Sequence, residues 1–336
     1  MSMSAKELFL ETIKKDGKPD RLLEQWEAFM PIMNDPLSIF TRGNRVRGKD
    51  TYDRWGTLIK FPEDAPGPMP HAVPGERVLE DITEWKEHVK VPDLLEPSRA
   101  PGAWDAAIEA RDKARADGFL AMGFMGTGIF EQSHYLMGME DALVAPLLDP
   151  DEAHELLQAI ADYKFTYTKE LVDNLKPDAI LSHDDWGSKT SLFFPPEVWR
   201  EFFKPHYAKM YGYMRDNGVI VMHHADCHCQ AVASDMVDIG VQVWQGVVNT
   251  NDIPAIIEET QGNLTIMGGI DSAIDNEDQT EEEIRKETRH VCETYGPLGH
   301  FIPCMCAGLK NSSIYPMTDK TVDDEIRAYN KDTYGI

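Results

Sequence analysis

The feature that most constrains the fold is a regular alternation of short apolar β-type runs with helical stretches from about residue 119 to residue 303. Such alternation is typical of a parallel sheet, because parallel neighbours need a crossover connection that is usually a helix. No G-x-G-x-x-G or Walker-type loop follows any of these runs, so a closed barrel is favoured over a doubly wound open sheet. We therefore expect an α/β fold, a single-domain (β/α)8 TIM barrel over residues 1–336. The expected strands are 23–29, 119–124, 179–182, 219–224, 241–246, 264–268 and 300–303.

Seven strands are one fewer than this barrel requires. The eighth is expected near residues 78–82 or within the polar, Gly- and Pro-rich segment 35–74. We interpret that segment as an irregular, hairpin-bearing excursion over the barrel mouth. Helix starts are clearer. Ser4 and Glu7 form a capping box for a helix that runs through residue 15, and Pro150 and Pro195 mark the beginnings of two further helices.

Composition limits the partners and the location of the chain. The net charge of −25 disfavours nucleic acid, because binding to phosphate depends on Lys and Arg contacts. No apolar run approaches the roughly 20 residues that a membrane span needs, and the polar N-terminus predicts no signal peptide. Two of the five cysteines form one C-x-C pair and two form another, unlike a secreted disulfide framework. We expect a cytoplasmic protein without a membrane or nucleic-acid partner.

Two of the β-type runs end in side chains that can bind metals. Residues 219–229 read VIVMHHADCHC, and residues 301–306 read FIPCMC. In a (β/α) barrel the carboxyl ends of the strands converge on one face, where active sites lie. The two clusters are therefore expected to share a site, with zinc as the candidate metal. The alternative is a set of free thiols and histidines that bind no metal.

A third cluster follows the run at 179–182, where residues 182–187 read SHDDWG. Consecutive carboxylates at a strand end repel each other, so at least one is expected to have a raised pKa if both are partly buried. Such a group can donate a proton near neutral pH. The alternative is a surface Asx-turn or a helix cap in which Gly187 is the turn residue.

Several motifs in the correct order resemble the uroporphyrinogen decarboxylase superfamily. They are HDDWG with the following SKTSLFFPPEVWREFFKP up to residue 205, GIFEQSHYLMGME at 128–140, DRWG at 53–56, WQG at 244–246 and GGID at 268–271. The similarity extends from about residue 5 to residue 330. The resemblance implies a single (β/α)8 barrel.

Within this superfamily the resemblance favours the cobalamin-dependent methyltransferases. Porphyrinogen decarboxylases carry an Arg-rich N-terminal segment that binds substrate carboxylates, whereas residues 20–29 here read DRLLEQWEAF, with Glu where Arg is needed. Thiol-methylating members bind zinc through H-x-C and a late Cys. The corresponding positions here are His224, Asp226 and either Cys304 or Cys306, a harder ligand set that suits an oxygen substrate. The chain thus resembles the component of anaerobic O-demethylases that removes the methyl group from the donor.

The resemblance implies that cob(I)alamin, carried by a partner corrinoid protein, takes a methyl group from a small methoxylated substrate, which we expect to be aromatic. The ether oxygen must be protonated or coordinated, because phenolate and alkoxide are poor leaving groups. Asp184 and Asp185 are the expected acids, His183 is expected to tune them, and Glu131 is a second candidate acid. The residues expected to contact the substrate are Trp26, Trp186, His223 and Gln245, with Trp244 as a further wall of the pocket.

Two other functions stay open. A cofactor-free decarboxylase acting on a smaller acid or a porphyrinogen would need an Arg at the barrel mouth, for which Arg42, Arg45 and Arg47 are available. A non-catalytic barrel that only binds partners would not need His and Asp at several strand ends. A homodimer is also possible, and the sequence does not name the methyl donor.

Overall fold

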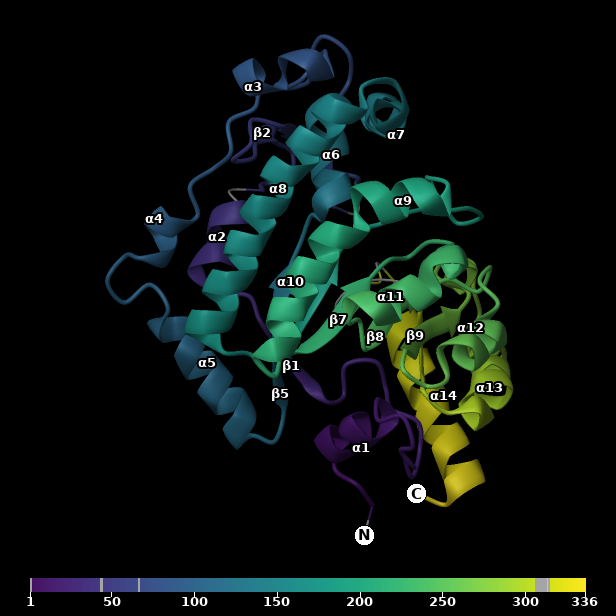
Figure 1. The fold of residues 1–336 in the computed structure, drawn as a ribbon. Helices are drawn as coiled ribbons and strands as arrows, with labels where there is room; N and C mark the ends of the chain where they lie inside the picture. The colour runs from purple at the N-terminus through teal and green to yellow at the C-terminus, as the bar shows by residue number, and fades with distance from the viewer. Residues whose placement is uncertain (1, 43–44, 66, 306–312, 314) are drawn as a thin grey trace.

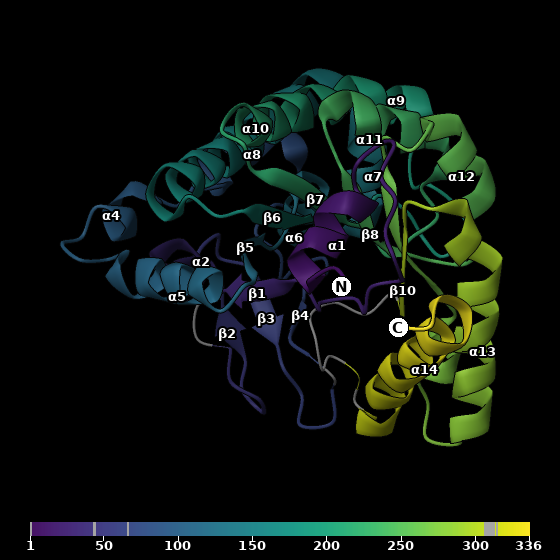
Figure 2. The same ribbon diagram turned by 90° about the horizontal axis from the view of Figure 1, so that it is seen from below.

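A computed structural model describes residues 2–42, 45–65, 67–305, 313 and 315–336. Its centre is a curled parallel sheet with helices on its outer side (Figures 1 and 2). Within the described residues the sheet has seven strands, and every hydrogen-bonded pair of neighbours is parallel. In their order across the sheet they are β1 (Phe29–Ile32), β5 (Leu120–Met125), β6 (Ala179–His183), β7 (Ile220–His224), β8 (Val243–Val247), β9 (Thr265–Ile270) and β10 (Phe301–Met305).

The predicted strands from residue 119 onward are confirmed to within a few residues, but the first is displaced. Residues 25–28 form a turn, and β1 begins only at Phe29. Backbone hydrogen bonds from Glu27 N to Glu24 O (3.2 Å) and from Phe29 N to Trp26 O (3.1 Å) close this turn. The apolar side chains of this segment pack into the barrel interior although their backbone forms a turn. Their apolar pattern therefore reflects burial and not a strand.

The outer helices follow the strands in the alternation that the sequence predicted. Their bounds are α5 (Asp105–Ala116), α6 (Ile129–Met137), α7 (Met139–Leu148), α8 (Pro150–Glu170), α9 (Pro196–Phe202), α10 (Lys204–Asp216), α11 (Ala233–Ile239), α12 (Ile253–Thr260), α13 (Glu281–Tyr295) and α14 (Pro316–Tyr334). The Pro residues at 150 and 196 occupy the first helical position, where a missing N–H costs nothing. Of the helices described, none is both long and apolar enough to span a bilayer.

The N-terminal helix α1 (Ala5–Thr12) lies across the amino-terminal end of the sheet (Figure 2). Ser4 and Glu7 form the predicted capping box, although the helix ends at Thr12 rather than at residue 15. Leu8 and Phe9 are fully buried in the cluster that fills the sheet interior. Because α1 closes this end, the opposite end, where the strands have their carboxyl termini, is left for a site.

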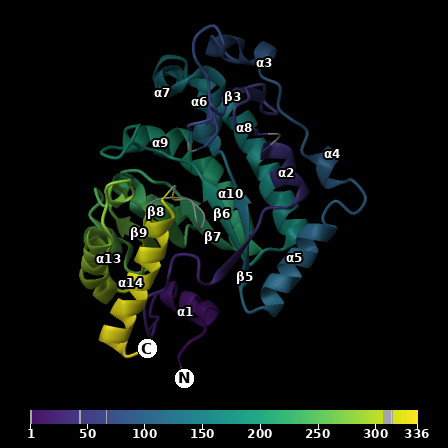
Figure 3. The ribbon, with the colours of Figure 1, turned by 180° about the vertical axis from the view of Figure 1, so that it is seen from behind.

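The excursion before β5 forms its own small structure. It contains α2 (Pro36–Arg42) and an antiparallel three-stranded sheet of β2 (Thr51–Tyr52), β3 (Leu58–Lys60) and β4 (Met69–Pro70). The short helices α3 (Trp85–His88) and α4 (Leu95–Ser98) follow. The predicted barrel strand near 78–82 is not formed, and β2–β4 do not join the parallel sheet. Helix α2 lies beside α8 (Figures 1 and 3), where the hydroxyls of Ser38 and Tyr167 are 3.2 Å apart.

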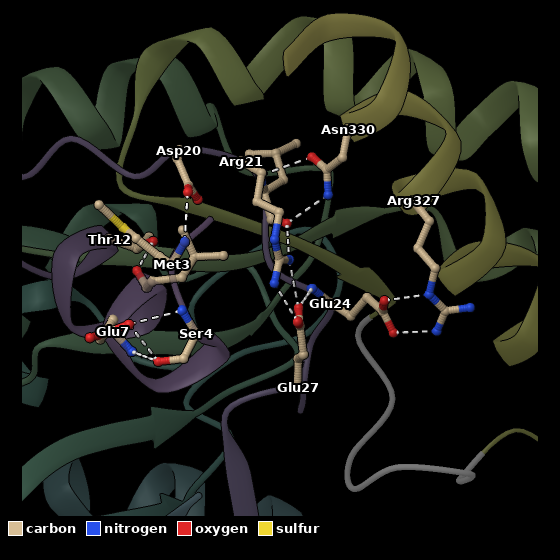
Figure 4. A network of polar contacts seen from close by, with 12 residues as sticks. Met3, Ser4, Glu7, Thr12, Asp20, Arg21, Glu24, Glu27, Arg327 and Asn330 are labelled. Atoms are coloured by element: carbon tan, nitrogen blue, oxygen red, sulfur yellow. Dashed lines mark hydrogen bonds and ion pairs between the residues drawn. The ribbon is translucent and has the colours of Figure 1, made fainter. Parts of the chain in front are cut away.

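The two edges of the sheet, β1 and β10, are bridged by the segment before β1 and by α14. Asn330 on α14 accepts a hydrogen bond from Leu22 N and donates one to Leu22 O, both at 2.9 Å (Figure 4). Arg327 forms a bidentate ion pair with Glu24, with both N–O distances at 2.7 Å. These contacts connect residues that are about 300 positions apart in the chain.

Candidate active site at the carboxyl ends of the strands

His183 and His224 end two neighbouring strands and lie opposite each other in the register of β6 and β7. Their imidazole rings stack with centroids 4.5 Å apart and an angle of 12° between planes. Asp185, two residues beyond His183, places Oδ2 at 3.8 Å from His183 Nε2. One potential ligand atom from each of His183, Asp185 and His224 lies within 4.8 Å of the others, which makes this a group able to hold a metal ion.

A buried acceptor orients each histidine. His183 Nδ1 donates to Glu131 Oε2 at 2.7 Å, and His224 Nδ1 donates to Gln245 Oε1. Each ring is therefore left with Nε2 as its second nitrogen. Metal-binding histidines commonly hold their other ring nitrogen in this way, because the partner fixes the tautomer and the ring orientation. Glu131 and Gln245 thus support a ligand set of two imidazoles and one carboxylate.

The pKa values of these groups depend on one another. Burial disfavours the imidazolium of His183, but the Glu131 carboxylate outweighs this and raises the pKa of His183 to about 10. Burial and the charge of His183 lower the pKa of His224 to about 4, so its ring is neutral at pH 7. Burial raises the pKa of Asp185 to about 6, although His183 opposes the shift. The chain alone thus places one cation, one neutral imidazole and one readily protonated carboxyl side by side.

Asp184 has a different environment. It is fully buried and accepts four hydrogen bonds, from Phe130 N (3.0 Å), Glu131 N (2.9 Å), Trp186 Nε1 (3.0 Å) and the Tyr207 hydroxyl. Two of these donors are free N–H groups in the first turn of α6, which a carboxylate stabilises. Burial and the nearby Glu131 charge raise the pKa of Asp184 to about 7. Its contacts hold α6, and with it Glu131, against β6.

Two residues expected to contact substrate lie in the core. His223 and Trp186 have no exposed surface and stack with ring centroids 4.0 Å apart. The Tyr211 hydroxyl and His223 Nδ1 are 2.8 Å apart. Because successive residues of a strand face opposite sides, His223 points to the helix layer when His224 points to the site. Trp244 is also fully buried, and its Nε1 donates to Ala225 O at 2.9 Å.

The other predicted ligands are not among the atoms of the His183–Asp185–His224 group. Asp226 lies beside it: its N–H donates to Asp185 Oδ1 at 3.0 Å, and burial and the Asp185 charge raise the pKa of its carboxyl to about 6, although His224 and His183 oppose the shift. Cys304 is buried on β10 and lines a cavity of about 410 Å³ together with Trp26 and α14. Cys306 lies outside the described residues. In the described part of the chain, the structure therefore joins His224 to His183 and Asp185 rather than to Asp226 and Cys304.

A cavity of about 210 Å³ adjoins the group, with Glu131 and His183 in its wall. Five aromatic side chains line it, those of Trp55, Phe124, Tyr135, Tyr163 and Tyr167. Its remaining lining includes Gln132 from α6, Lys164 from α8 and Arg45 from the excursion. Gln132 and Lys164 are not among the site residues predicted from the sequence. A signal for Lys164 was available, because it continues the apolar stripe of Leu157 and Ile160 on α8 and a Lys on a buried stripe is uncommon.

The uroporphyrinogen decarboxylase (URO-D) family model matches residues 54–312, which is most of the chain. The chain belongs to the uroporphyrinogen decarboxylase family. The predicted fold class, a (β/α)8 barrel, is that of the family, and the described residues supply seven of its strands.

A methyltransferase from Methanosarcina mazei has a similar fold, with a TM-score of 0.64 and 15% sequence identity. The similarity covers 99% of this chain and 100% of that chain. No curated protein matches the sequence. The family match spans Glu131, His183, Asp185, His224 and Gln245, so the potential ligand group and the two residues that orient it lie within the family domain.

Proposed function

We propose that this protein is a corrinoid-dependent methyltransferase that demethylates a small methoxylated aromatic compound. The methyl acceptor is cob(I)alamin on a separate corrinoid protein, which is a substrate in this reaction. The observation that carries the proposal is the His183–Asp185–His224 group, located beside a cavity with aromatic walls. Membership of the uroporphyrinogen decarboxylase family and the shared fold of a methyltransferase support it.

The ligand group fits a catalytic zinc ion. Catalytic zinc sites use three protein ligands, often histidines with one carboxylate, and keep a further position open for water or substrate. His183 and His224 have their Nδ1 atoms held by Glu131 and Gln245, and Asp185 supplies the carboxylate. Zinc bound here would act as a Lewis acid toward the ether oxygen. Because His183 must lose its proton to bind zinc, the affinity is expected to fall as the pH is lowered.

The side chains of the protein control the proton and the position of the substrate. In the reaction the O–CH3 bond of the ether breaks, its electron pair stays on oxygen, and the methyl carbon bonds to the acceptor. The oxygen then needs a proton. Asp185 has one of two roles. As a zinc ligand it would be deprotonated, and the oxygen would then take its proton from water. Without zinc it is the best placed donor, because its side chain is 29% exposed, lies beside His183 and has a raised pKa of about 6. The aromatic walls of the cavity would hold the ring of the substrate.

A second candidate function is the decarboxylation of a small acid. It is favoured by Arg45, which lines the same cavity and could bind a carboxylate. Arg47 is less available, because it donates to Glu63 O and Ala65 O and stacks on Phe61. This candidate requires no corrinoid and releases carbon dioxide, so the two reactions have different products.

The test is a methyl-transfer assay with zinc-loaded enzyme, a reduced corrinoid protein and a methoxylated aromatic compound. We expect a methylated corrinoid and the corresponding phenol, with close to one zinc per chain. If Asp185 is the general acid, Asp185→Asn should lower the rate by about 10²–10⁴-fold and change substrate binding much less, because proton donation matters chiefly in the transition state. If Asp185 is a zinc ligand, the same variant should also lose zinc affinity.

The metal ligands are tested by elemental analysis of the purified variants. His183→Ala and His224→Ala should lose zinc, whereas Cys304→Ser should retain it. Retention of zinc by both histidine variants would contradict the ligand set. If the protein releases carbon dioxide from a small acid without corrinoid, its function is that of a decarboxylase and not of a methyltransferase.

A further inference from the structure

The aromatic cavity beside His183 is rich in cations, although the chain as a whole has a net charge of −25. Its lining contains two carboxylates, those of Asp53 and Glu131. Against these stand three cationic side chains, those of Arg45, Arg54 and Lys164. A local excess of positive charge inside a strongly acidic protein points to an anionic ligand.

Both carboxylates of the cavity are already occupied. Glu131 accepts from His183 Nδ1 (2.7 Å) and from Gly128 N (3.1 Å). Asp53 Oδ1 accepts from the backbone N–H groups of Trp55 and Thr57, both at 2.8 Å. Neither of them is therefore the direct partner of the lysine in this cavity.

Lys164 is 5% exposed and has no carboxylate within 4.0 Å in the described part of the chain. Its Nζ donates to Gly126 O at 3.3 Å, a long bond that uses one of its three donors. A buried ammonium without a paired carboxylate is costly, and the Tyr163 ring, whose centroid is 5.4 Å from Nζ, replaces only part of the water that it loses. Burial accordingly lowers the pKa of Lys164 to about 8. An anionic ligand would supply the missing partner.

Gln132 provides an independent observation on the same wall. Its side chain is 3% exposed, and its Nε2 is a buried donor with no hydrogen-bond partner among the described residues. Both Gln132 and Lys164 line the cavity. A ligand group with two acceptor oxygens could take a hydrogen bond from Lys164 Nζ and another from Gln132 Nε2.

We propose that Lys164 and Gln132, assisted by Arg45, bind the carboxylate of the substrate, so that the methyl donor is a methoxylated aromatic acid. This rests on the proposed function for the ether chemistry and adds the chemical class of the donor. The cavity volume of about 210 Å³ suits a single-ring compound rather than a tetrapyrrole. Lys164 and Gln132 would be specificity residues, because they act on the end of the ligand that does not react.

The test measures binding to the purified protein without corrinoid, by titration calorimetry with two matched probes. These are 4-methoxybenzoate and the neutral 4-methoxybenzyl alcohol, with the 3-methoxy pair as a repeat. We expect the acid to bind at least tenfold more tightly than the alcohol. Lys164→Met should remove this preference, Gln132→Leu should reduce it, and Lys164→Arg should retain part of it. Lys169→Met, on the same helix but half exposed and paired with Asp173, is the control and should leave it unchanged.

Equal affinity of the unaltered protein for acid and alcohol would overturn the inference. An equal loss of affinity for both ligands in Lys164→Met would overturn it as well. If Lys164→Met does not fold, Gln132→Leu and Lys164→Arg decide by the same comparison. Displacement of the benzoate by inorganic phosphate at equal concentration would assign the cavity to phosphate and overturn the carboxylate assignment. Selective binding of the acid without any methyl transfer would refute the proposed function alone. Demethylation of acid and alcohol with equal kcat/KM would refute this inference alone.

Discussion

Asp184 and Asp185 are consecutive residues after β6, yet only Asp185 keeps part of its side chain exposed. Both oxygens of Asp184 accept hydrogen bonds, Oδ1 from Glu131 N and Oδ2 from Phe130 N, Trp186 Nε1 and the Tyr207 hydroxyl. The packing here is tight, because a Cβ added at Gly128 would lie 2.0 Å from Asp184 Cγ. At this scale the two neighbours separate into a structural carboxylate and a candidate acid.

We predict that Asp184→Asn lowers the free energy of unfolding by about 2–4 kcal/mol, because its amide NH2 would face at least one N–H group in either orientation. Asp185→Asn should change stability by less than about 1 kcal/mol, since its surroundings are partly solvated. Urea denaturation followed by circular dichroism measures both values. Equal stability of the two variants would show that the Asp184 contacts do not hold α6.

The pH dependence of acid binding is a second prediction at the residue scale. Burial lowers the pKa of Lys164 from 10.5 to about 8, so this group is an ammonium below pH 8 and loses its charge above it. The affinity for methoxybenzoate should therefore be highest below pH 8 and fall by up to about tenfold per pH unit above it. The other charged groups around Lys164 are Arg45, Arg54, Asp53, Glu131, Asp184 and His183.

Lys164→Arg separates this effect from the titration of those neighbours. A guanidinium stays protonated throughout pH 6.5–9.5, so the variant should bind with little change above pH 8. Calorimetric titrations across this range provide the measurement. The assignment to Lys164 would be contradicted by a flat profile in the unaltered protein, or by the same fall in the Arg variant.

At the scale of elements, the ends of β7 and β8 determine where His224 lies. The register between β8 and β9 shifts between Gln245 and Val247, which marks a bulge at Gly246. Gly246 has φ +90°, and a Cβ added there would lie 3.0 Å from His224 Cε1. A bulge next to a site commonly re-aims a side chain. Here it leaves room for the imidazole and keeps Gln245 in contact with it.

Gly246→Ala should therefore weaken zinc binding by about tenfold or more, because both the backbone and the His224 ring must shift. Gly218→Ala is the matched control. Gly218 also has positive φ (+74°), but an added Cβ would meet nothing within 4 Å. Both variants should lose about 1–2 kcal/mol of stability through the left-handed backbone, whereas only Gly246→Ala should lose zinc affinity. Competition titration with a zinc chelator measures this, and equal zinc affinities would refute the role of the bulge.

For the whole molecule, the described parallel sheet has edges at β1 and β10, which residues 20–27 and α14 connect. Asn330 is 3% exposed and satisfies both backbone groups of Leu22. The Arg327–Glu24 pair lies further out, with 56% of the Arg327 side chain exposed. Closure thus depends on one buried amide more than on the surface ion pair.

We predict that Asn330→Ala lowers the free energy of unfolding by about 2–4 kcal/mol, because two buried backbone groups lose their partners. Arg327→Ala should cost less than about 1 kcal/mol, as is usual for an exposed ion pair. Urea denaturation midpoints compare the two variants. If Arg327→Ala proved the more damaging change, the ion pair and not the amide would hold the two edges together.

The sequence by itself determined the alternation of strands and helices, the capping box at Ser4 and the strand ends that carry His183, Asp185 and His224. These features follow from local periodicity and from the rule that parallel strands converge at their carboxyl ends. The same local reasoning was wrong for residues 23–29. A turn closed by backbone hydrogen bonds, and held to α14 from about 300 residues away, replaces the expected strand there.

Only the tertiary structure decided which of these side chains meet. It directed His224 rather than His223 to the site, buried Asp184 under α6, and grouped His183 and Asp185 with His224 as potential ligands. It also brought Gln132, Arg45 and Lys164 from three separate segments to one cavity. The physical reason is that burial and the neighbouring groups determine the role of a charged or hydrogen-bonding side chain. Those neighbouring groups come from elements that are distant in the chain.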